Sequence, residues 1–286
     1  MPSPHSILAA SNLRARRELG QNFLKDPSVA EKIVASAEIG ETDVVLEIGA
    51  GLGAMTIAAG RRAGRLIAVE KDRQLVPLLK TELADRGLAN VEVIEGNILA
   101  LSLSDFAAAA AHPIVVIGNL PYNISSQVVV KLVHERASVS RAVLMFQKEL
   151  AERLCAPPGS KVYGRLSVLL QYCADTKVLH HIRADKFFPR PKVDSIVLGI
   201  KFKTTIAQPV GDEALFVRVV QAAFGQRRKT LRNALSGGLL PLGGDDTIAV
   251  LQQAGIEPRR RAETLSVYEF VTLTDVIAAH LSQSGS

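Results

Sequence analysis

The chain has 286 residues, a formal net charge of +6 and a pI near 9.4. Hydrophobic residues make up 48% of it and charged residues 22%, which excludes a disordered chain and supplies a core for one large domain, or for a large and a small one. Its two cysteines, Cys155 and Cys173, have neither a disulfide pattern nor metal-ligand spacing. We therefore expect a soluble, cytoplasmic protein with reduced thiols and no metal site.

Neither of two apolar stretches is expected to enter a membrane. In SILAASNLRARRELG (6–20) the apolar run is short and the charges follow it, unlike in a secretory signal. The uncharged segment between Asp105 and Lys131 contains Pro113, Gly118 and Pro121, which argue against a transmembrane helix.

Predicted strands and helices alternate along the first half of the chain. Apolar, β-branched runs predict strands in DVVLEIGAG (43–51), RLIAVE (65–70), VEVIEG (91–96), IVVIGN (114–119) and RAVLMF (141–146). A helix is expected at 54–62 and another at 72–86, with Asp72 as N-cap and Gly87 after its end, although Pro77 predicts a kink or a later start. A further helix is expected to follow the strand at 141–146 and to end at Leu154. This order predicts a parallel, Rossmann-like α/β sheet with helices on both faces.

The pattern changes in the second half. TKVLHHI (176–182) and DSIVLGIKF (194–202) predict an antiparallel hairpin that closes the edge of the sheet. Helical sequence follows from about residue 207, broken at SGGLLPLGG (236–244) and GIEP (255–258). We expect a basic N-terminal tail at 1–18, a catalytic α/β domain at 19–206 and a small helical domain at 207–286.

A glycine-rich turn follows the first predicted strand, in EIGAGLGAMT (47–56). Its spacing is G-x-G-x-G, not the G-x-G-x-x-G of dinucleotide-binding folds, and alone it is compatible with a tight turn that binds nothing. Glu70 ends the next strand, where doubly wound folds place an acidic residue against ribose hydroxyls, and Asn97 follows the third strand at a position suited to an adenine edge. The ligand is therefore NAD or S-adenosylmethionine, and the shorter glycine pattern favours the second.

The fourth strand leads into VVIGNLPYNIS (115–125), where an asparagine, a carbonyl and an aromatic ring follow one another. Pro121 disfavours helical geometry at Leu120, which leaves the Leu120 carbonyl free. That carbonyl and the Asn119 amide oxygen can accept both N–H bonds of an exocyclic amine, and Tyr122 offers a face for a flipped base. The motif predicts amine methylation without a covalent nucleophile; the alternative is a turn with a buried, satisfied asparagine.

Basic residues gather before the first motif at Arg14–Arg17, again in QRRKTLRNAL (226–235), and at Arg259–Arg261. One such run is usually a solvated surface, but three on a basic chain favour a polyanionic partner. If 226–235 is a helix, Arg228 and Arg232 share a face beside Lys229, while Leu231 and Leu235 face a core. We expect Arg227, Arg228, Lys229 and Arg232 to contact RNA phosphates, although a solubilising helix would look the same.

Taken together, these segments resemble the S-adenosylmethionine-dependent small-subunit ribosomal RNA adenine N6,N6-dimethyltransferase family, linked in bacteria to kasugamycin resistance. The segments that carry the resemblance span nearly the whole chain in family order: GQNFLKD (20–26), EIGAGLGAMT (47–56), VEKD (69–72), GNLPYNIS (118–125), FQKELAERL (146–154), YGRLSVLLQY (163–172), FFPRPKVDS (187–195) and QRRKTLRNAL (226–235).

The resemblance implies direct methyl transfer to N6 of two adjacent adenosines in the 3′-terminal hairpin of 16S rRNA, within the 30S subunit, by a monomeric enzyme. It implies that Asn119 and Leu120 hold the amine, that Tyr122 stacks on the adenine and that Phe187 stacks from the other side. The cofactor residues it implies are Asn22, Leu24, Gly49, Gly51, Glu70, Lys71, Asn97 and Asn119. The family usually has aspartate where this chain has Asn97, so we expect looser cofactor binding.

Three other functions remain open from the sequence. The related 23S rRNA adenine N6-methyltransferases of macrolide resistance share the cofactor and target atom, although PKVDS (191–195) and QRRKTLRNAL favour the small-subunit type. In a ribosome-assembly factor, binding to the ribosomal subunit would be the main role and catalysis would be secondary. A nicotinamide oxidoreductase is disfavoured by the glycine spacing and by the asparagine–proline turn.

Overall fold

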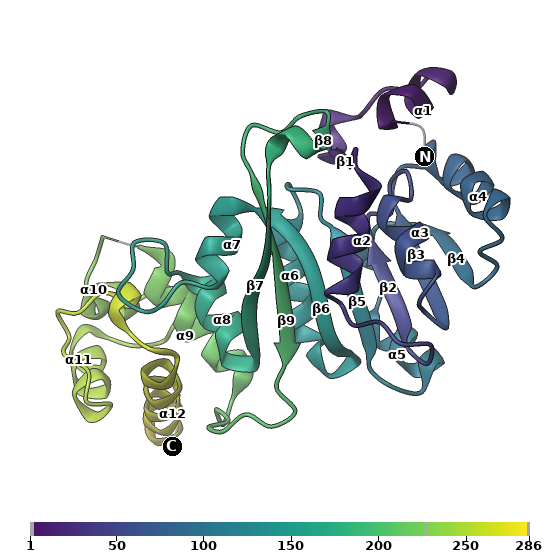
Figure 1. Cartoon of the computed structure of the whole chain (residues 1–286). Coiled ribbons are helices and arrows are strands. Elements are labelled where there is room, and N and C mark those ends of the chain that lie inside the picture. Colours follow the sequence, from purple (N-terminus) through teal and green to yellow (C-terminus); the bar gives the residue numbers. More distant parts are fainter. Residues whose placement is uncertain (1–2, 227, 285–286) are drawn as a thin grey trace. The chain divides into compact units, whose positions relative to one another are not determined.

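A computed structural model describes residues 3–226 and 228–284 (Figure 1). The chain forms two compact units: residues 1–151 with 175–202, and residues 152–174 with 203–286. The predicted division at residue 206 placed 152–174 with the sheet. The structure groups this segment with the C-terminal helices instead, because α8 (Arg165–Cys173) packs against α9 (Glu213–Gly225).

The first unit contains a seven-stranded sheet in the order β4-β3-β2-β5-β6-β9-β7. Its parallel part is made of the five predicted strands, and β9 pairs antiparallel with β6, so the predicted mixed sheet is confirmed. The strands are β2 (Val44–Ile48), β3 (Arg65–Glu70), β4 (Val91–Glu95), β5 (Ile114–Asn119), β6 (Val139–Gln147), β7 (Ala174–Ile182) and β9 (Ser195–Phe202). The strand order reverses between β2 and β5, and at such a point open α/β sheets bind their ligands.

Helices cover both faces of this sheet. On one face α2 (Pro27–Ala35) and α3 (Ala54–Gly60) pack on alternate strand residues such as Val45, Val115 and Val143. Beside them, α4 (Leu75–Asp85) packs through Leu79 and Leu83. Figure 1 shows α6 (Ser125–His134) behind the sheet, and α5 (Leu103–Ala110) contacts β5. The late start of α4 puts Pro77 in its first turn, where proline is tolerated, so the helix needs no kink.

The N-terminal segment is more ordered than the predicted basic tail. Helix α1 (Pro4–Ala10) is capped by Ser3, whose side chain accepts a hydrogen bond from the Ser6 N–H. Its Leu8 is buried in a cluster with Phe23 and Leu75. A short 3-10 turn, η1 (Arg17–Leu19), leads to β1 (Phe23–Leu24). Strand β1 pairs antiparallel with β8 (Phe187–Phe188), so that Phe23 lies opposite Phe188 and Leu24 opposite Phe187.

The second unit is helical. It consists of α8, α9, α10 (Leu231–Leu235), α11 (Gly244–Gln253) and α12 (Val267–Ser284), and α7 (Lys148–Leu154) ends within it. Aromatic rings fill its core: Tyr172 lies 4.7 Å from Phe216 between ring centroids, and Phe224 stacks on Phe270 at 5.9 Å. Further short turns are η2 (Ile98–Ala100), η3 (Arg136–Ser138), η4 (Ala184–Lys186) and η5 (Ala262–Thr264). Over the described residues, every helix is too short or too polar to span a bilayer.

Candidate active site

A cavity of about 280 Å³ opens at the switch point of the sheet. It is lined by the N-terminal segment and by residues at the ends of β2, β3 and β5. It brings together nearly all the residues predicted for cofactor and amine binding: Asn22, Leu24, Gly49, Gly51, Glu70, Lys71, Asn97, Asn119, Leu120 and Tyr122. Segments that are distant in the sequence therefore meet in one place, as the order of the strands requires.

Glu70 is fixed at the cavity wall by the backbone around it. Its Oε2 accepts a hydrogen bond from the Gly51 N–H at 2.7 Å, and its Oε1 accepts one from the Asp72 N–H at 2.8 Å. Burial raises the pKa of this carboxyl, whereas the N–H donors of Asp72 and Gly51 lower it. Each carboxylate oxygen keeps a second lone pair, so Glu70 can still accept hydrogen bonds from a pair of ribose hydroxyls.

The glycine turn needs its glycines for backbone conformation and for space. Gly49 has φ +77° and Gly51 has φ +56°, in the left-handed region that other residues rarely adopt. A Cβ at Gly51 would also lie 3.1 Å from the Phe23 ring. The turn therefore brings bare backbone to the cavity beside β1.

The N-terminal segment is tied to the end of β3 and to the asparagine turn. Gln21 donates a hydrogen bond to the Asp72 Oδ2 at 2.8 Å and accepts one from the Arg16 N–H, also at 2.8 Å. The neighbouring Asn22 carbonyl accepts a hydrogen bond from the Asn119 Nδ2 at 2.8 Å. The segment thus closes one side of the cavity and sets the orientation of Asn119.

At the end of β5, two acceptors are left for a ligand. The Asn119 amide nitrogen is bound by Asn22, so its Oδ1 is the atom that remains. The Leu120 N–H donates to the Met145 carbonyl at 3.3 Å, which anchors the peptide. Within the described part of the chain, neither the Asn119 Oδ1 nor the Leu120 carbonyl accepts a hydrogen bond. This pair matches the two N–H groups of an exocyclic amine.

Tyr122 is the aromatic wall of the same turn. Its hydroxyl lies 2.8 Å from the Oγ of Ser195, a fully buried residue at the start of β9. Burial raises the pKa of Tyr122, and the Ser195 contact lowers it in part, so the phenol stays neutral at physiological pH. The ring is held by its polar end and lines the cavity.

Asn97 lines the cavity next to η2. Its Oδ1 accepts a hydrogen bond from the Leu99 N–H at 3.2 Å and thereby caps this short turn. The oxygen predicted to accept the adenine amine therefore already accepts one backbone hydrogen bond and has one lone pair left for a ligand. A carboxylate at this position would have a second charged oxygen for the ligand.

The structure does not support the predicted stacking role of Phe187. The Phe187 ring is only 1% exposed and belongs to the hydrophobic core, together with Leu24. Its pairing with Leu24 in the β1–β8 ladder turns it toward the core, and it does not line the cavity.

Glu47 lines the cavity, and no role was predicted for it from the sequence. It lies in the otherwise apolar strand β2, is 1% exposed and lines the cavity. Its Oε2 has no hydrogen-bond partner within residues 3–226 and 228–284. The available signal was a carboxylate inside the buried run VVLEI, because charged residues are almost never fully buried without a partner.

The basic segment 226–235 differs from its prediction. Helix α10 begins only at Leu231, after an extended Thr230, so Arg228 and Lys229 lie in the preceding turn and share no helical face with Arg232. Leu231 and Leu235 are fully buried, as expected. The predicted RNA contact Arg227 lies outside the described residues.

Two basic segments of the second unit lie side by side. The Leu231 N–H donates to the Arg260 carbonyl at 2.8 Å, and the Arg232 N–H donates to the Pro258 carbonyl at 3.2 Å. The exposed cations on these segments form what we call the basic surface: Arg228, Lys229, Arg232, Arg259 and Arg261. No side-chain ion pair joins any of them to another described residue.

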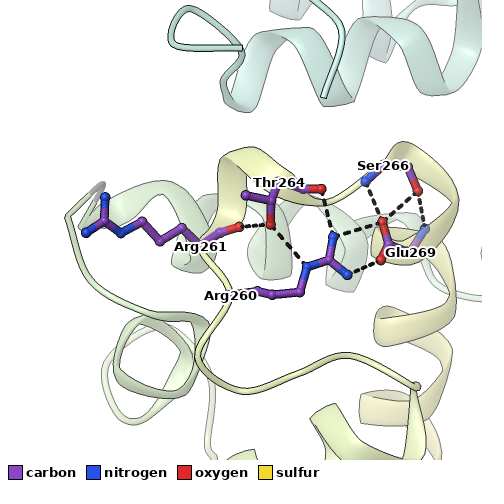
Figure 2. Close-up of polar contacts among 5 residues, drawn as sticks. All are labelled: Arg260, Arg261, Thr264, Ser266 and Glu269. Carbon is purple, nitrogen blue, oxygen red and sulfur yellow. Dashed lines mark hydrogen bonds and ion pairs between the residues drawn. The ribbon is translucent and has the colours of Figure 1, made fainter. Parts of the chain in front are cut away.

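Arg260, by contrast, holds its loop in place (Figure 2). Its guanidinium pairs with Glu269 and donates to the Thr264 carbonyl at 2.7 Å. Glu269 also accepts a hydrogen bond from the Ser266 N–H at 2.8 Å at the start of α12. The Arg261 side chain points away from this cluster in Figure 2, so Arg260 is structural, whereas the Arg261 guanidinium pairs with no other residue that the structure describes.

The chain is similar to known proteins over nearly its whole length. The family model described as ribosomal RNA adenine dimethylase matches residues 12–279. The ribosomal RNA small subunit methyltransferase A of Desulforapulum autotrophicum is 48% identical over 97% of this chain and 97% of its own length. The protein of the same name from Geobacter sulfurreducens is 47% identical over 95% of this chain and 98% of its own length.

Solved structures show the same fold. A dimethyladenosine transferase from Plasmodium falciparum has a TM-score of 0.76 at 26% identity, covering 92% of this chain and 98% of that one. The 23S rRNA methyltransferase ErmE has a TM-score of 0.68 at 22% identity, covering 90% of this chain and 99% of that one. The predicted resemblance is thus confirmed: the chain belongs to the ribosomal RNA adenine dimethylase family.

Proposed function

We propose that this protein transfers methyl groups from S-adenosylmethionine to N6 of two adjacent adenosines near the 3′ end of 16S rRNA, in the 30S subunit. The observation that carries the proposal is the pair of unbound acceptors, the Asn119 Oδ1 and the Leu120 carbonyl, in the same cavity as Glu70. An adenosine amine and an adenosine-containing cofactor can therefore meet in one cavity.

The residues at the switch point suit S-adenosylmethionine. Glu70 would accept the ribose hydroxyls, Asn97 would contact the adenine, and the turn at Gly49 would let the methionine part approach the backbone. The carboxylates of Glu47 and Glu70 also favour a cationic ligand at this wall. The cofactor supplies an electrophilic methyl group on a sulfonium, which leaves as a neutral thioether.

The Asn119 turn would orient and activate the amine. When Asn119 and Leu120 accept its two N–H bonds, the nitrogen lone pair leaves conjugation with the adenine ring and points at the methyl carbon. The amine would then accept the methyl group that the cofactor supplies, with the sulfonium leaving as the neutral thioether, and the amine proton would pass to water. No strong base is required, and Tyr122, held by Ser195, would fix the plane of the base.

The basic surface would dock structured RNA. Its five cations have no carboxylate partners in the described chain, so phosphates can take that place. Arg260 would keep the loop of Arg259 and Arg261 in a fixed shape through Glu269. Recognition of folded rRNA by shape needs such preorganised cations more than it needs base-edge contacts.

The test uses labelled S-adenosylmethionine with 30S subunits from cells that lack this dimethylation, followed by nucleoside analysis and mapping. We expect N6,N6-dimethyladenosine at two adjacent positions, with fully methylated subunits and 50S subunits unlabelled. Label in 23S rRNA would instead assign the resistance-type reaction. A protein that binds the 30S subunit, transfers no label and supports maturation as a Glu70→Ala variant would be an assembly factor.

A further inference from the structure

Helix α1 (Figure 1) is kept in place by its side-chain contacts and not by its own length. It has seven residues, and isolated helices shorter than about 12 residues are marginal in water. Leu8 is 3% exposed and packs in one cluster with Leu52 and Leu75. In the first turn of the helix, the His5 ring meets Phe188 edge to face, with 5.2 Å between the ring centroids. The docked position of α1 therefore depends on these contacts.

The docked helix forms a wall of the cavity. Pro4, which is buried, and Ile7, which is half-buried, both line it. The cluster around Leu8 shows which wall this is, because Leu52 belongs to the glycine turn and Leu75 follows the end of β3. The helix thus lies at the end of the cavity proposed for the cofactor. Both lining side chains are apolar, so α1 covers this end without offering a side-chain hydrogen bond to it.

A short link joins α1 to a segment that is fixed independently. Asn12 in this link is exposed and has φ +53°, so the chain turns sharply after the helix. Beyond the link, Arg16 pairs with Asp72 at 3.5 Å, and the Asn22 carbonyl accepts the hydrogen bond from Asn119. Because these contacts hold the segment from Arg16 onward, α1 can leave its place while Asn119 keeps its orientation.

We propose that α1 is a gate for the cofactor: the helix undocks as a unit, turning about residues 11–15, to let S-adenosylmethionine enter and S-adenosylhomocysteine leave. Leu8 sets the population of the undocked state and does not touch the cofactor, since it does not line the cavity. Opening of the gate limits both association and dissociation, so one substitution changes both rates in the same direction. This inference rests on the proposed cofactor but not on the proposed RNA substrate.

The test measures both rates for S-adenosylhomocysteine by surface plasmon resonance on the whole, immobilised protein. Leu8→Ala removes the buried side chain that holds the helix, so the association and dissociation rate constants should each rise about tenfold or more. Their ratio, the dissociation constant, should change much less. The matched control is Leu103→Ala in α5, at a leucine that is 1% exposed and does not line the cavity. This control should lower the free energy of unfolding and leave both rate constants unchanged.

Hydrogen exchange shows independently whether α1 has undocked. The Ile7 N–H donates to the Ser3 carbonyl at 3.0 Å, and the Leu13 N–H donates to the Leu8 carbonyl at 2.8 Å. Both amides are protected only while the helix is formed, and a helix of this length does not persist once it has undocked. Leu8→Ala should therefore speed exchange at Ile7 and Leu13 but not at Leu46 in β2.

Faster exchange in α1 with either rate constant unchanged would overturn the proposal, because α1 would then be a wall that does not limit exchange of the cofactor. Exchange in α1 that Leu8→Ala does not alter would also overturn it, because Leu8 would then not hold the helix. If S-adenosylhomocysteine does not bind the wild type, the proposed cofactor fails and the gate fails with it. Because no RNA is present, a failure of rRNA methylation alone would leave these rates standing.

Discussion

A single hydrogen bond decides which atom of Asn119 faces the cavity. Its amide nitrogen is bound to the Asn22 carbonyl, and the oxygen is left for the substrate. The proposed substrate contact thus depends on a residue from a distant part of the chain. The neighbouring Leu120 carbonyl comes from backbone, so no substitution removes it, and Asn119 is the half of the pair that mutation can test.

Asn119→Ala should lower kcat for methyl transfer by about 10²–10³, the usual effect of removing one preorganised polar contact. The matched control is Asn90→Ala, because the Asn90 amide bonds the carbonyls of Gly60 and Ala63, both at 2.8 Å, and does not line the cavity. Asn90→Ala should lower the free energy of unfolding but leave kcat nearly unchanged. Equal kcat for the two variants would show that the Asn119 side chain takes no part in methyl transfer.

Asn97→Asp should tighten binding of S-adenosylhomocysteine by about three- to tenfold, because a carboxylate can cap the Leu99 N–H and still offer a charged oxygen to the ligand. Titration calorimetry at constant pH measures the change. Unchanged or weaker binding would mean that this side chain does not contact the adenine.

The raised pKa of Glu47 has a consequence for stability. A carboxyl whose folded pKa lies above its unfolded value contributes stability at low pH, and that contribution is lost as pH rises from about 4.5 to about 7. Glu47→Gln has no carboxyl to ionise at this position, so its unfolding free energy does not decrease with pH for this reason. Relative to the wild type, it should therefore gain up to about 3 kcal/mol of unfolding free energy between about pH 4 and about pH 8. Urea unfolding without cofactor measures this difference, and parallel pH profiles would contradict it.

At the scale of elements, the site depends on how closely β2 and β5 approach. A Cβ added to Gly118 would lie 2.7 Å from the Ile48 carbonyl oxygen, which is backbone and cannot move alone. Gly118 immediately precedes Asn119, so the spacing of the two strands sets the position of the amide.

Gly118→Ala should therefore cost about 1–3 kcal/mol of unfolding free energy, as overpacking usually does, and should also reduce methyl transfer. At Gly40, just before β2, an added Cβ would meet only the Asp43 carboxylate at 3.9 Å, so Gly40→Ala is a mild control. Thermal unfolding and initial rates of methyl transfer are measured for both variants. Full activity in Gly118→Ala would show that the spacing of β2 and β5 is adaptable.

The elements also show where prediction from sequence stops. Apolar runs locate the parallel strands, and the carboxyl ends of β3, β4 and β5 then bring Glu70, Asn97 and Asn119 together. The orientation of Phe187 depends on pairing with Leu24, far away in sequence, which no local pattern specifies. The start of α10 likewise depends on bonds from Leu231 and Arg232 to a distant loop.

At the scale of the whole molecule, the cavity belongs to the first unit and the basic surface to the second. Chemistry and docking should therefore be separable by mutation. The N-terminal basic residues do not separate in this way. Arg16 forms an ion pair with Asp72 beside Glu70, so it contributes to the structure of the site as well as to the positive charge of the chain.

Replacing Arg228, Lys229 and Arg232 together by alanine should weaken binding to unmethylated 30S subunits about tenfold or more at moderate salt, since each lost phosphate contact removes a counterion-release contribution. The slope of log affinity against log salt should also become shallower. The affinity for S-adenosylhomocysteine should not change.

The control is a triple alanine variant that removes the same amount of positive charge from the first unit, at the exposed residues Lys80, Lys177 and Lys201. If both triple variants lose 30S binding equally, net charge and not the basic surface governs docking.

The most direct test of the central claim is a crystal structure of the protein with S-adenosylhomocysteine and a short adenosine-containing RNA. We predict that the target N6 lies within hydrogen-bonding distance of the Asn119 Oδ1 and the Leu120 carbonyl, with the base against Tyr122 and the cofactor ribose on Glu70. An adenosine bound elsewhere, or an N6 that faces away from Asn119 while the cofactor is in place, would contradict this account.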